Sequence, residues 1–408
     1  MQNVSITGRG VVSSLGLELD EFSSKLDRAF VQVQAAPAAI EGSGEFLWAS
    51  MVQDFSPTDW MSERVAAGTD PFAQYAIAAA VKSVESAGDL EMDPLRTAVL
   101  VGTSMAGVET LVDSQHGLDT VGVEGVSRKL QIQAWPNMAA GQIALHYGLH
   151  GPLLTVCTAC ASALDAIGLA ARMIESGAVE VAIAGGCDRA RSKVLAVSAQ
   201  LYGMVQSESD PLKVCRPFDV ERTGIMSGEG AGMVILENAD RAKARGASIH
   251  GYLRGYANVS DGFHPSSPDP SGQWERRAME LAQEEAAVAP EAVDAVLAHG
   301  TGTPVGDTAE IRAINDLFGR ADLPVTSIKG HLGHTAGAAG VMNLLAALHS
   351  LEEGVVVPTA GTKKLDPEVD FEVVLDHARP ASLETVQVNA FGFGGQDSSL
   401  VVTRYDSA

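Results

Sequence analysis

The segment TVCTACASAL, residues 155–164, carries two cysteines three positions apart, Cys157 and Cys160. This spacing occurs in dithiol redox motifs and in halves of zinc sites, but also where only one thiol reacts. Zinc is disfavoured because the nearest paired histidines, His331 and His334, lie most of a domain away, whereas the two halves of a zinc finger lie about a dozen residues apart. Redox chemistry is also disfavoured, because Cys157 falls within the apolar strand pattern LLTVCTA and is expected to be buried.

Cys160 differs from Cys157 because it follows the strand pattern and opens the helical pattern ASALDAIGLAARMIESG. The N-terminus of a helix stabilises a thiolate, so we expect a lowered pKa for the Cys160 thiol. The residues after it, Ala161, Ser162 and Ala163, are small and leave the sulfur accessible to a substrate. This pattern favours a nucleophile. The segment alone leaves open the alternative of a small, buried apolar cysteine.

Three further stretches bring groups that would complete a site around such a nucleophile. AHGTGTPVGDTAE ends a strand pattern at a histidine and continues into two acids, SIKGHLGHTAGAAG places a lysine and a histidine before an Ala/Gly-rich helix, and NAFGFGGQDSSL runs from a strand into a Gly-rich turn. Singly, these stretches also suit a core histidine, a solvated lysine and an ordinary turn. Because sites in open α/β sheets gather at strand ends, together they predict one site. Its members would be Cys160, His299, Lys329, His334 and the turn at residues 391–395.

The elements that must position these groups alternate along the chain. Strand patterns are expected at residues 97–104, 153–159, 181–187, 233–238, 295–301 and 386–395, and helical patterns at 71–88, 161–177, 272–287, 307–319 and 335–354. This alternation predicts an α/β fold. A soft boundary at residue 245 separates two loosely similar halves, residues 1–245 with the cysteine nucleophile and residues 246–408 with the His, Lys and His residues and the FGFGG turn.

Composition disfavours several other classes of protein. The chain has 408 residues, of which 46% are hydrophobic and 19% charged, which suits one large α/β unit or two domain-sized halves. A net charge of −23 disfavours nonspecific nucleic-acid binding, and without an uninterrupted apolar stretch of about 18 residues we expect no membrane insertion. Four cysteines, and a start without a basic and apolar leader, predict a cytoplasmic location.

In this order, the motifs carry a resemblance to a known family. TACAS, AHGTGT, KGHLGHTAGAAG and FGFGG, with ITGRGVVSSLG, PNMAAGQIALHYGLHGP and RPFDVERTGIMSGEGAGMVILE, are similar to motifs of the β-ketoacyl–acyl carrier protein synthases of the thiolase superfamily. These are the condensing enzymes of fatty-acid and polyketide synthesis, and the resemblance covers essentially the whole chain. It implies a five-layered αβαβα fold of two similar halves and a dimer. It also implies that Cys160 is the nucleophile and Cys157 its neighbour in the strand.

The resemblance implies how the reaction would proceed. Cys160 would hold an acyl chain delivered by an acyl carrier protein, and the backbone N–H groups of Cys160 and Phe393 would bind the oxyanion. A malonyl thioester would lose carbon dioxide, and its enolate, stabilised by His299 and His334, would attack the acyl group. A pair of histidines indicates decarboxylative condensation rather than reversible thiolysis. Neither a metal nor another cofactor is required.

Lys329 resembles the active-site lysine of the family, with Glu310 as its acidic partner and Asp307 in support. A buried lysine without a partner would be costly, which favours an electrostatic role over direct proton transfer. His331, between Lys329 and His334, is expected to be structural.

Further residues resemble the gate and the acyl pocket of the family. Phe393 matches the gating phenylalanine, and its glycine neighbours would permit the movement of the backbone. The stretch SDGFHPSSPDPSG, residues 260–272, resembles the partner loop of the gate. Met105 lies where the family limits the depth of the acyl chain, although ordinary core packing is an alternative. The predicted pocket and gate comprise Met105, Ala199, Asp261, His264, Phe391, Gly392, Phe393 and Gly394.

Several positions depart from the family pattern near the pocket. FGFGGTN is replaced by FGFGGQD, which introduces Gln396 and Asp397, and RDGF is replaced by RTGI with Thr223. Ala199 stands where a phenylalanine is common, and Tyr202 is also unusual. None of these changes removes a catalytic group. The substrate is therefore either a fatty-acyl chain or an intermediate of a type II polyketide or polyene pathway.

Two other roles stay open. The chain forms either a homodimer or a ketosynthase heterodimer, in which it is the active or the chain-length-setting subunit. An acyltransferase or decarboxylase that never condenses would share the same fold. A cysteine-free partner subunit is disfavoured because Cys160 is present. An acidic carrier protein would need a local basic patch despite the net charge of −23. Candidates for this patch are Arg128, Lys129, Arg189 and Arg191.

Overall fold

A continuous 11-stranded sheet forms the frame of the structure, a computed structural model that describes residues 4–35, 47–189 and 191–405. Its order is β13-β11-β10-β15-β16-β9-β1-β8-β6-β4-β5. The strands are β1 (Val4–Ser13), β4 (Thr97–Gly102), β5 (Leu153–Val156), β6 (Val181–Asp188), β8 (Gly230–Asn238), β9 (Gly251–Ser260), β10 (Ala295–Leu297), β11 (Pro324–Thr326), β13 (Glu372–Val373), β15 (Thr385–Gly392) and β16 (Gln396–Thr403).

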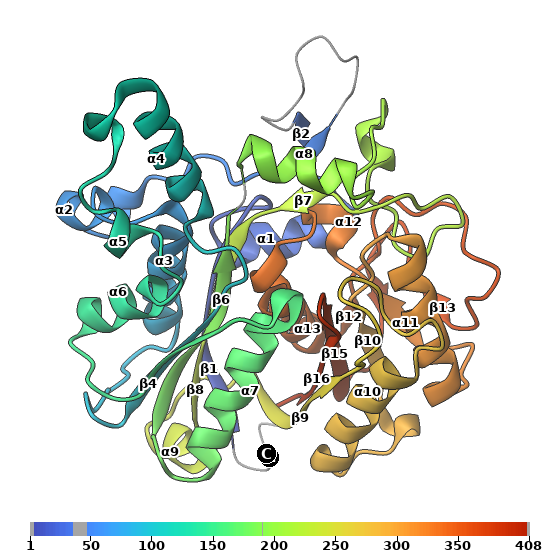
Figure 1. Cartoon of the computed structure of the whole chain (residues 1–408). Coiled ribbons are helices and arrows are strands. Elements are labelled where there is room, and N and C mark those ends of the chain that lie inside the picture. Colours follow the sequence, from blue (N-terminus) through green and yellow to red (C-terminus); the bar gives the residue numbers. More distant parts are fainter. Residues whose placement is uncertain (1–3, 36–46, 190, 406–408) are drawn as a thin grey trace.

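Helices cover both faces of this sheet and also fill its middle (Figure 1). The longer ones are α3 (Pro71–Ser86), α4 (Val108–Val121), α6 (Met138–Tyr147), α7 (Ser162–Glu175), α8 (Lys193–Leu201), α10 (Gln273–Ala286), α11 (Pro304–Phe318) and α13 (Ala339–Glu353). The shorter ones are α1 (Leu19–Leu26), α2 (Glu63–Ala66), α5 (Leu130–Gln133), α9 (Ala239–Ala244) and α12 (Lys329–Leu332). Two small sheets, β2 (Gln34–Ala35) with β3 (Trp48–Ser50) and β7 (Ser227–Gly228), and β12 (Val355–Val356) with β14 (Arg379–Pro380), complete the described chain.

The sheet and helices stack in five layers, which confirms the predicted αβαβα fold (Figure 1). Helices α3 and α6 form one outer layer against β1, β8, β6 and β4, and α10 and α11 form the other outer layer beside β9, β16 and β15. Helices α7 and α13 lie between the two halves of the sheet, where residues 339–348 of α13 are all buried. The main apolar cluster of the core runs through this central layer. The division of the chain at residue 245 stays a prediction.

The expected strands and helices named above are all present, and their boundaries differ for local reasons. The strand expected at 295–301 ends at Leu297, because Gly300 and Gly302 adopt positive φ angles of 40° and 80° and turn the chain. The helix expected from 307 begins at Pro304, because the Thr303 hydroxyl accepts a hydrogen bond from the Gly306 N–H and caps that end.

Parallel pairing brings four strand ends to one region. β4 runs parallel to β5 and β6, and β10 runs parallel to β11 and β15. The segments that follow β5, β10, β11 and β15 carry Cys160, His299, Lys329 and Phe393, respectively. The site therefore lies where the carboxyl ends of parallel strands meet, as is usual in α/β sheets.

Cys157 follows β5, and the expectation that it is buried is wrong. Its side chain is exposed. Among the described strands, β5 ends the sheet and pairs with β4 alone, so one of its edges is left unpaired. Leu153 and Leu154 are 46% and 44% exposed at this edge, which leaves apolar surface for a partner. None of the helices in the described ranges is long and apolar enough to cross a membrane.

The packing of Gly102 against the start of α7, the helix that follows Cys160, can be tested by substitution. It ends β4, and a Cβ atom there would lie 2.3 Å from the backbone carbon of Ser162 at the start of α7. We therefore expect Gly102→Ala to lower the free energy of unfolding by about 3 kcal/mol. In the matched control Gly141→Ala, nothing lies within 4 Å of the added Cβ atom in helix α6, so we expect a gain of about 0.5–1 kcal/mol. Denaturant unfolding measures the free energy of unfolding of both variants, and equal values would contradict this close packing.

Candidate active site

A cavity of about 550 Å³ opens between the two halves of the sheet, and the predicted catalytic residues other than Lys329 line it. Its wall includes Cys160, His299, His334, Phe393 and Glu310. The rest of the lining is mainly apolar and includes residues 47–51 and part of the stretch 195–205, which comprises helix α8 and the segment that follows it. The cavity therefore joins a cluster of reactive groups to a mainly apolar space, as expected for a ligand site.

Cys160 lies in a short 3-10 turn, residues 159–161, that leads directly into α7. Ala159 has a φ angle of +47°, which is an unfavourable conformation for alanine. The turn is held by Ser162, whose hydroxyl donates to the Ala159 carbonyl at 2.6 Å and accepts from the Thr158 N–H at 2.9 Å. The Thr158 hydroxyl in turn donates to buried Asp165. These contacts impose the strained turn that presents Cys160 to the cavity.

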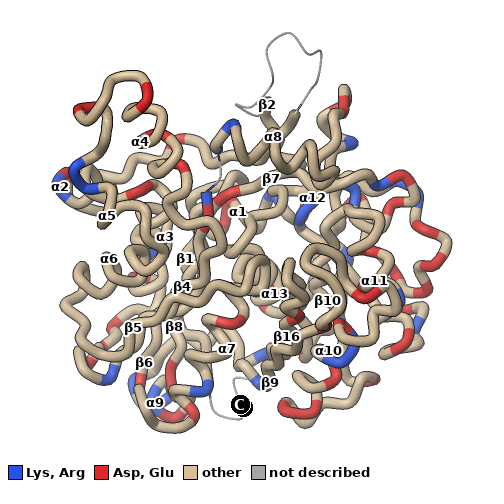
Figure 2. The backbone as a smooth tube through the Cα atoms, in the orientation of Figure 1, with Lys and Arg blue, Asp and Glu red and all other residues tan. Residues whose placement is uncertain are grey.

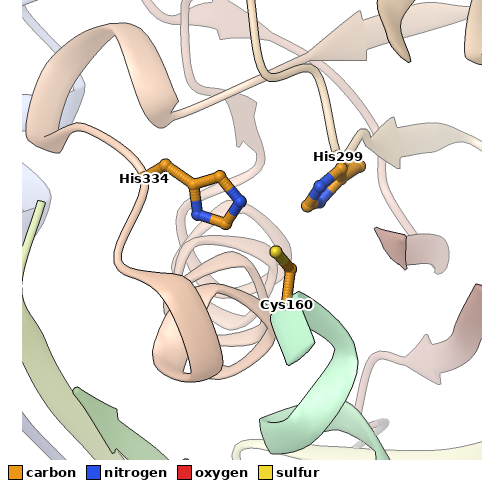
Figure 3. Close-up of side chains that lie close together, drawn as sticks. All are labelled: Cys160, His299 and His334. Carbon is orange, nitrogen blue, oxygen red and sulfur yellow. The ribbon is translucent and has the colours of Figure 1, made fainter. Parts of the chain in front are cut away.

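Two imidazoles face the sulfur. Figure 3 shows the rings of His299 and His334 directed toward the Cys160 side chain. The Cys160 sulfur and one nitrogen of each ring all lie within 4.8 Å of one another. The two rings meet edge to face, with 5.3 Å between their centroids. A small group bonded to the sulfur would therefore lie within reach of both imidazoles.

Hydrogen bonds fix the tautomer of both histidines. The Lys329 ammonium lies 3.2 Å from His299 Nδ1, and a protonated lysine can only donate. The Ala336 N–H donates to His334 Nδ1 at 3.1 Å. Burial lowers the pKa of both histidines well below 6.5, and the Lys329 charge adds to that effect. Each ring is therefore neutral and carries its single proton on Nε2, so both rings act as hydrogen-bond donors.

The same arrangement bears on metal binding. Three ligand atoms within 4.8 Å of one another would be close enough to hold a metal ion. Ligation would require both Nε2 atoms to give up their protons beside the buried Lys329 charge, which repels a cation. The donor set therefore suits an oxygen atom with developing negative charge better than a metal.

Lys329 is the buried cation of the site, with a side chain that is only 2% exposed. Its ammonium also donates to the His299 carbonyl. Burial lowers the pKa of the Lys329 ammonium, whereas the charge of Glu310 opposes that shift. Glu310 accepts from the N–H groups of His299 at 2.8 Å and Gly300 at 2.7 Å. The carboxylate therefore compensates the lysine and fixes the end of β10 at the same time.

Asp307 binds backbone N–H groups in the turn after β10, as Glu310 does at the end of that strand. Its carboxylate accepts from the N–H groups of Phe218 at 2.8 Å and Gly302 at 3.0 Å, and it lies 3.8 Å from the Arg222 guanidinium. His331, by contrast, points away from the cavity. Its Nδ1 and Nε2 lie 2.9 and 2.7 Å from the carbonyls of Phe30 and Pro358, which fits its expected structural role.

The expectation of a lowered pKa for the nucleophile is wrong. Burial raises the pKa of the Cys160 thiol to about 11. The Lys329 charge and the backbone N–H groups of Phe393 and Cys160 favour the thiolate, but they do not outweigh its desolvation. Those N–H groups nevertheless point at the sulfur, where an oxyanion would form.

The turn that carries Phe393 comes close to the nucleophile. A Cβ atom at Gly392 would lie 3.0 Å from the Thr158 carbonyl and 3.1 Å from the Cys160 nitrogen. Glycine at 392 therefore allows this close approach of two backbones. Of the other residues predicted for the pocket and gate, Met105, Ala199, Asp261 and Phe391 also line the cavity. His264 and Gly394 do not line it, although the Gly394 N–H donates to the Pro265 carbonyl in the neighbouring loop.

Sequence reasoning missed two buried acids near the site, Asp188 and Glu275, and named a third, Asp397, only as a departure from the family pattern. Asp188 accepts hydrogen bonds from residues 103–106 and from Gly337, and so ties the end of β6 to two loops of the cavity. Glu275 and Asp397 line the cavity beside Asp261. The sequence signal for Asp397 was its departure from the FGFGGTN pattern. Glu275 and Asp188 carry no local signal, because their surroundings come from distant segments.

The four residues expected to dock a carrier protein fall into two pairs. Arg128 and Lys129 are exposed. Arg189 lies 2.9 Å from Glu109, and Arg191 is paired with buried Glu229, so both charges are compensated within the chain. Figure 2 shows Lys and Arg residues interspersed with Asp and Glu over the molecule rather than gathered on one face. A docking role for these four residues stays a prediction.

Comparison with known proteins places the chain among condensing enzymes. Residues 1–242 match the model of the β-ketoacyl synthase N-terminal domain, and residues 250–363 match that of the C-terminal domain. The 3-oxoacyl-[acyl-carrier-protein] synthase 2 of Rhizobium meliloti is 33% identical over 99% of both chains.

Solved structures show the same fold. The ishigamide ketosynthase/chain length factor has a TM-score of 0.93 at 31% identity and covers 99% of this chain and 100% of its own. A type II PKS acyl-carrier protein in complex with its ketosynthase bound to the hexaketide gives a TM-score of 0.90 at 25% identity, again over 99% and 100% of the chains.

The pKa of Cys160 can be checked by alkylation. Because burial raises that pKa to about 11, we expect the rate of Cys160 alkylation by iodoacetamide to rise about tenfold per pH unit from pH 7 to 10. In Lys329→Met the rate should fall several-fold at each pH, because a charge that favours the thiolate is lost. Peptide mass spectrometry measures this, with exposed Cys157 as the internal reference. A rate for Cys160 that levels off by pH 8 would contradict the raised pKa.

Proposed function

Because this chain belongs to the β-ketoacyl synthase family, we propose that Cys160 carries the acyl chain in a decarboxylative condensation and that His299 and His334 stabilise the enolate. The protein is an acyl-transferring condensing enzyme, a β-ketoacyl-acyl carrier protein synthase, and its partner is acyl carrier protein in fatty-acid or polyketide synthesis. The observation that supports the residue roles best is the meeting of one thiol and two N–H-donating imidazoles at the wall of one cavity.

The first step is transfer of the acyl group. The Cys160 sulfur attacks the thioester carbonyl of the carrier-bound chain, and the new thioester forms as the carrier thiol leaves. The thiol proton ends on the carrier thiol, so the step has no net demand for acid or base. The N–H groups of Cys160 and Phe393 bind the oxyanion of the tetrahedral intermediate, since both already point at the sulfur.

The second step is decarboxylation of the malonyl group. As carbon dioxide leaves, negative charge develops on the thioester oxygen of the remaining two-carbon unit. The Nε2–H groups of His299 and His334 donate to that oxygen, and neither ring titrates near pH 7, because the pKa of each lies well below 6.5. Lys329 lies behind His299 and holds its tautomer, which is an electrostatic role rather than a proton transfer.

The third step forms the carbon–carbon bond. The enolate carbon attacks the acyl carbonyl on Cys160, the Cys160–acyl bond breaks, and a 3-ketoacyl thioester two carbons longer leaves on the carrier protein. The Cys160 thiolate takes up a proton, which restores the starting thiol. The cavity of about 550 Å³ would have to hold the acyl chain on Cys160 and the malonyl group at the same time.

The proposal includes a dimer, in which a second subunit of the same fold packs against this chain. The open edge of β5 exposes Leu153 and Leu154, and α4 exposes Leu111, Leu118 and Val121. Such apolar surface is typical of an interface. The partner is either another copy of this chain or a second subunit of the same fold, since the ketosynthase/chain length factor is a structural neighbour. The proposal also includes a cytoplasmic location, which the four free cysteines support because they suit a reducing compartment.

The condensation itself separates this proposal from an acyltransferase or decarboxylase of the same fold. The wild-type protein, given acyl-carrier protein and malonyl-carrier protein, should yield a 3-ketoacyl-carrier protein, detected by mass spectrometry, with one carbon dioxide per product. We expect His299→Ala and His334→Ala each to lower the rate of product formation at least about 10²-fold, because one donor to the enolate is lost. The control is His377→Ala, an exposed histidine. Carbon dioxide release without a ketoacyl product would contradict condensation.

A further inference from the structure

Three carboxyl groups from three different elements gather beside the Phe393 turn. Asp397 comes from β16, Glu275 from α10, and Asp261 from the loop after β9. All three line the cavity, and their exposed fractions are only 2%, 3% and 7%. None belongs to the catalytic steps described above, so their presence at the wall of the site needs a separate explanation.

The three groups differ in their hydrogen bonds. Asp261 accepts from the N–H groups of Phe263 at 3.0 Å and Asp269 at 3.3 Å. Asp397 Oδ2 and Glu275 Oε2 are buried and have no hydrogen-bond partner among the described residues. An ionised carboxylate is strongly disfavoured when one of its oxygens is buried without a donor. These two groups therefore need either a cation or a proton.

The geometry favours a proton. Among the described residues, the only acids, histidines and cysteines close enough together to hold a metal ion are Cys160, His299 and His334. Burial and the charge of Asp261 raise the pKa of Asp397 to about 7, with a smaller effect of Glu310. Burial and the charge of Asp397 raise the pKa of Glu275 well above its usual value.

Charged groups on the neighbouring helix do not relieve this excess of negative charge. Glu310 and Asp307 of α11 both add to it at Glu275. The cations of this region are already engaged, since Lys329 interacts with Glu310 and Arg222 lies 3.8 Å from Asp307.

The acids lie where two loops meet. The Asp261 N–H donates to the Gly395 carbonyl at 3.0 Å, and the Gly394 N–H donates to the Pro265 carbonyl at 2.9 Å. A Cβ atom at Gly395 would lie 1.9 Å from Oδ1 of the Asp261 side chain and 3.3 Å from the Asp261 backbone nitrogen, so the two loops are in close contact. Asp397 pairs with Phe391 across the β15–β16 hairpin. Its carboxyl group is therefore at the base of the turn that presents the Phe393 N–H to Cys160.

We propose that Asp397 is a proton-binding positioning residue: in its neutral form it lets the Phe393 turn close against the Asp261 loop, and its ionisation drives the two loops apart. Glu275 stays protonated beside Asp397 and adds no charge to the wall of the cavity. The inference rests on the proposed function only for its link to acylation of Cys160, since the loop contact exists independently of any reaction.

The direction of the pH effect follows from the raised pKa. In the closed arrangement the pKa of Asp397 is about 7, compared with an ordinary value of 3.8 for an exposed group. The closed form therefore binds the proton more tightly and is favoured at low pH. The ratio of closed to open should fall about tenfold per pH unit between about pH 4 and pH 7 and change little above pH 7.

Hydrogen exchange of the two loops tests this proposal without any reaction. We expect the opening constant of residues 391–397 and 261–270 in the wild-type protein to rise about tenfold per pH unit from pH 5.5 to 7, after correction for intrinsic amide exchange, and then to level off. Asp397→Asn, isosteric and always neutral, should abolish this rise. The matched control Asp322→Asn removes the same charge at a side chain that is 79% exposed and should behave like the wild type.

Each further outcome is decisive. Glu275→Gln should keep the wild-type slope, and loss of the slope in this variant alone would overturn the assignment to Asp397. The same pH dependence in Asp397→Asn and wild type would overturn the whole proposal. A pH-dependent opening in a protein that never acylates Cys160 would refute the proposed function but support the proton-dependent gate.

Discussion

One buried positive charge, the ammonium of Lys329, sets the chemistry of the cavity. With 2% of its side chain exposed, it requires compensation, and Glu310 provides it while also binding the N–H groups at the end of β10. The same ammonium donates a hydrogen bond to His299 Nδ1, so the ring proton is fixed on Nε2. Burial, together with this charge, lowers the pKa of both imidazoles and keeps them neutral, and the charge partly opposes the rise that burial causes in the pKa of the Cys160 thiol. A neutral residue at 329 would leave Glu310 buried without its cation and His299 without a defined tautomer.

Buried carboxylates position the rest of the site by binding backbone and side chains from both halves of the sheet. Asp165 of α7 accepts from Tyr256 and Asn258 of β9, at 2.8 and 2.9 Å, and so ties the helix behind Cys160 to the second half. Asp188 of β6 does the same for Gly337, which precedes α13. Catalytic groups of the two halves can therefore hold a fixed distance although they come from segments far apart in the chain.

Sequence patterns predicted the strands, the helices and the meeting of Cys160, His299, Lys329 and His334, because periodicity and strand ends are local features. Three properties depended on distant contacts and were not predicted. Cys157 is exposed since β5 is an edge strand, which a strand pattern alone cannot reveal. The thiol pKa of Cys160 reflects desolvation by the surrounding walls, which exceeds the effect of its own helix. The unpartnered acids at 275 and 397 become a pair only when α10 packs on β16.

The central claim is that Cys160 is the acyl acceptor, and intact-protein mass tests it most directly. The wild-type protein and Cys160→Ala would be incubated side by side with a panel of carrier proteins bearing acyl chains of different length and unsaturation. We predict a mass gain equal to one acyl group in the wild type and none in the variant, and the chains that load define which acyl groups fit the cavity. An adduct that persists in Cys160→Ala, or none with any chain, would contradict it.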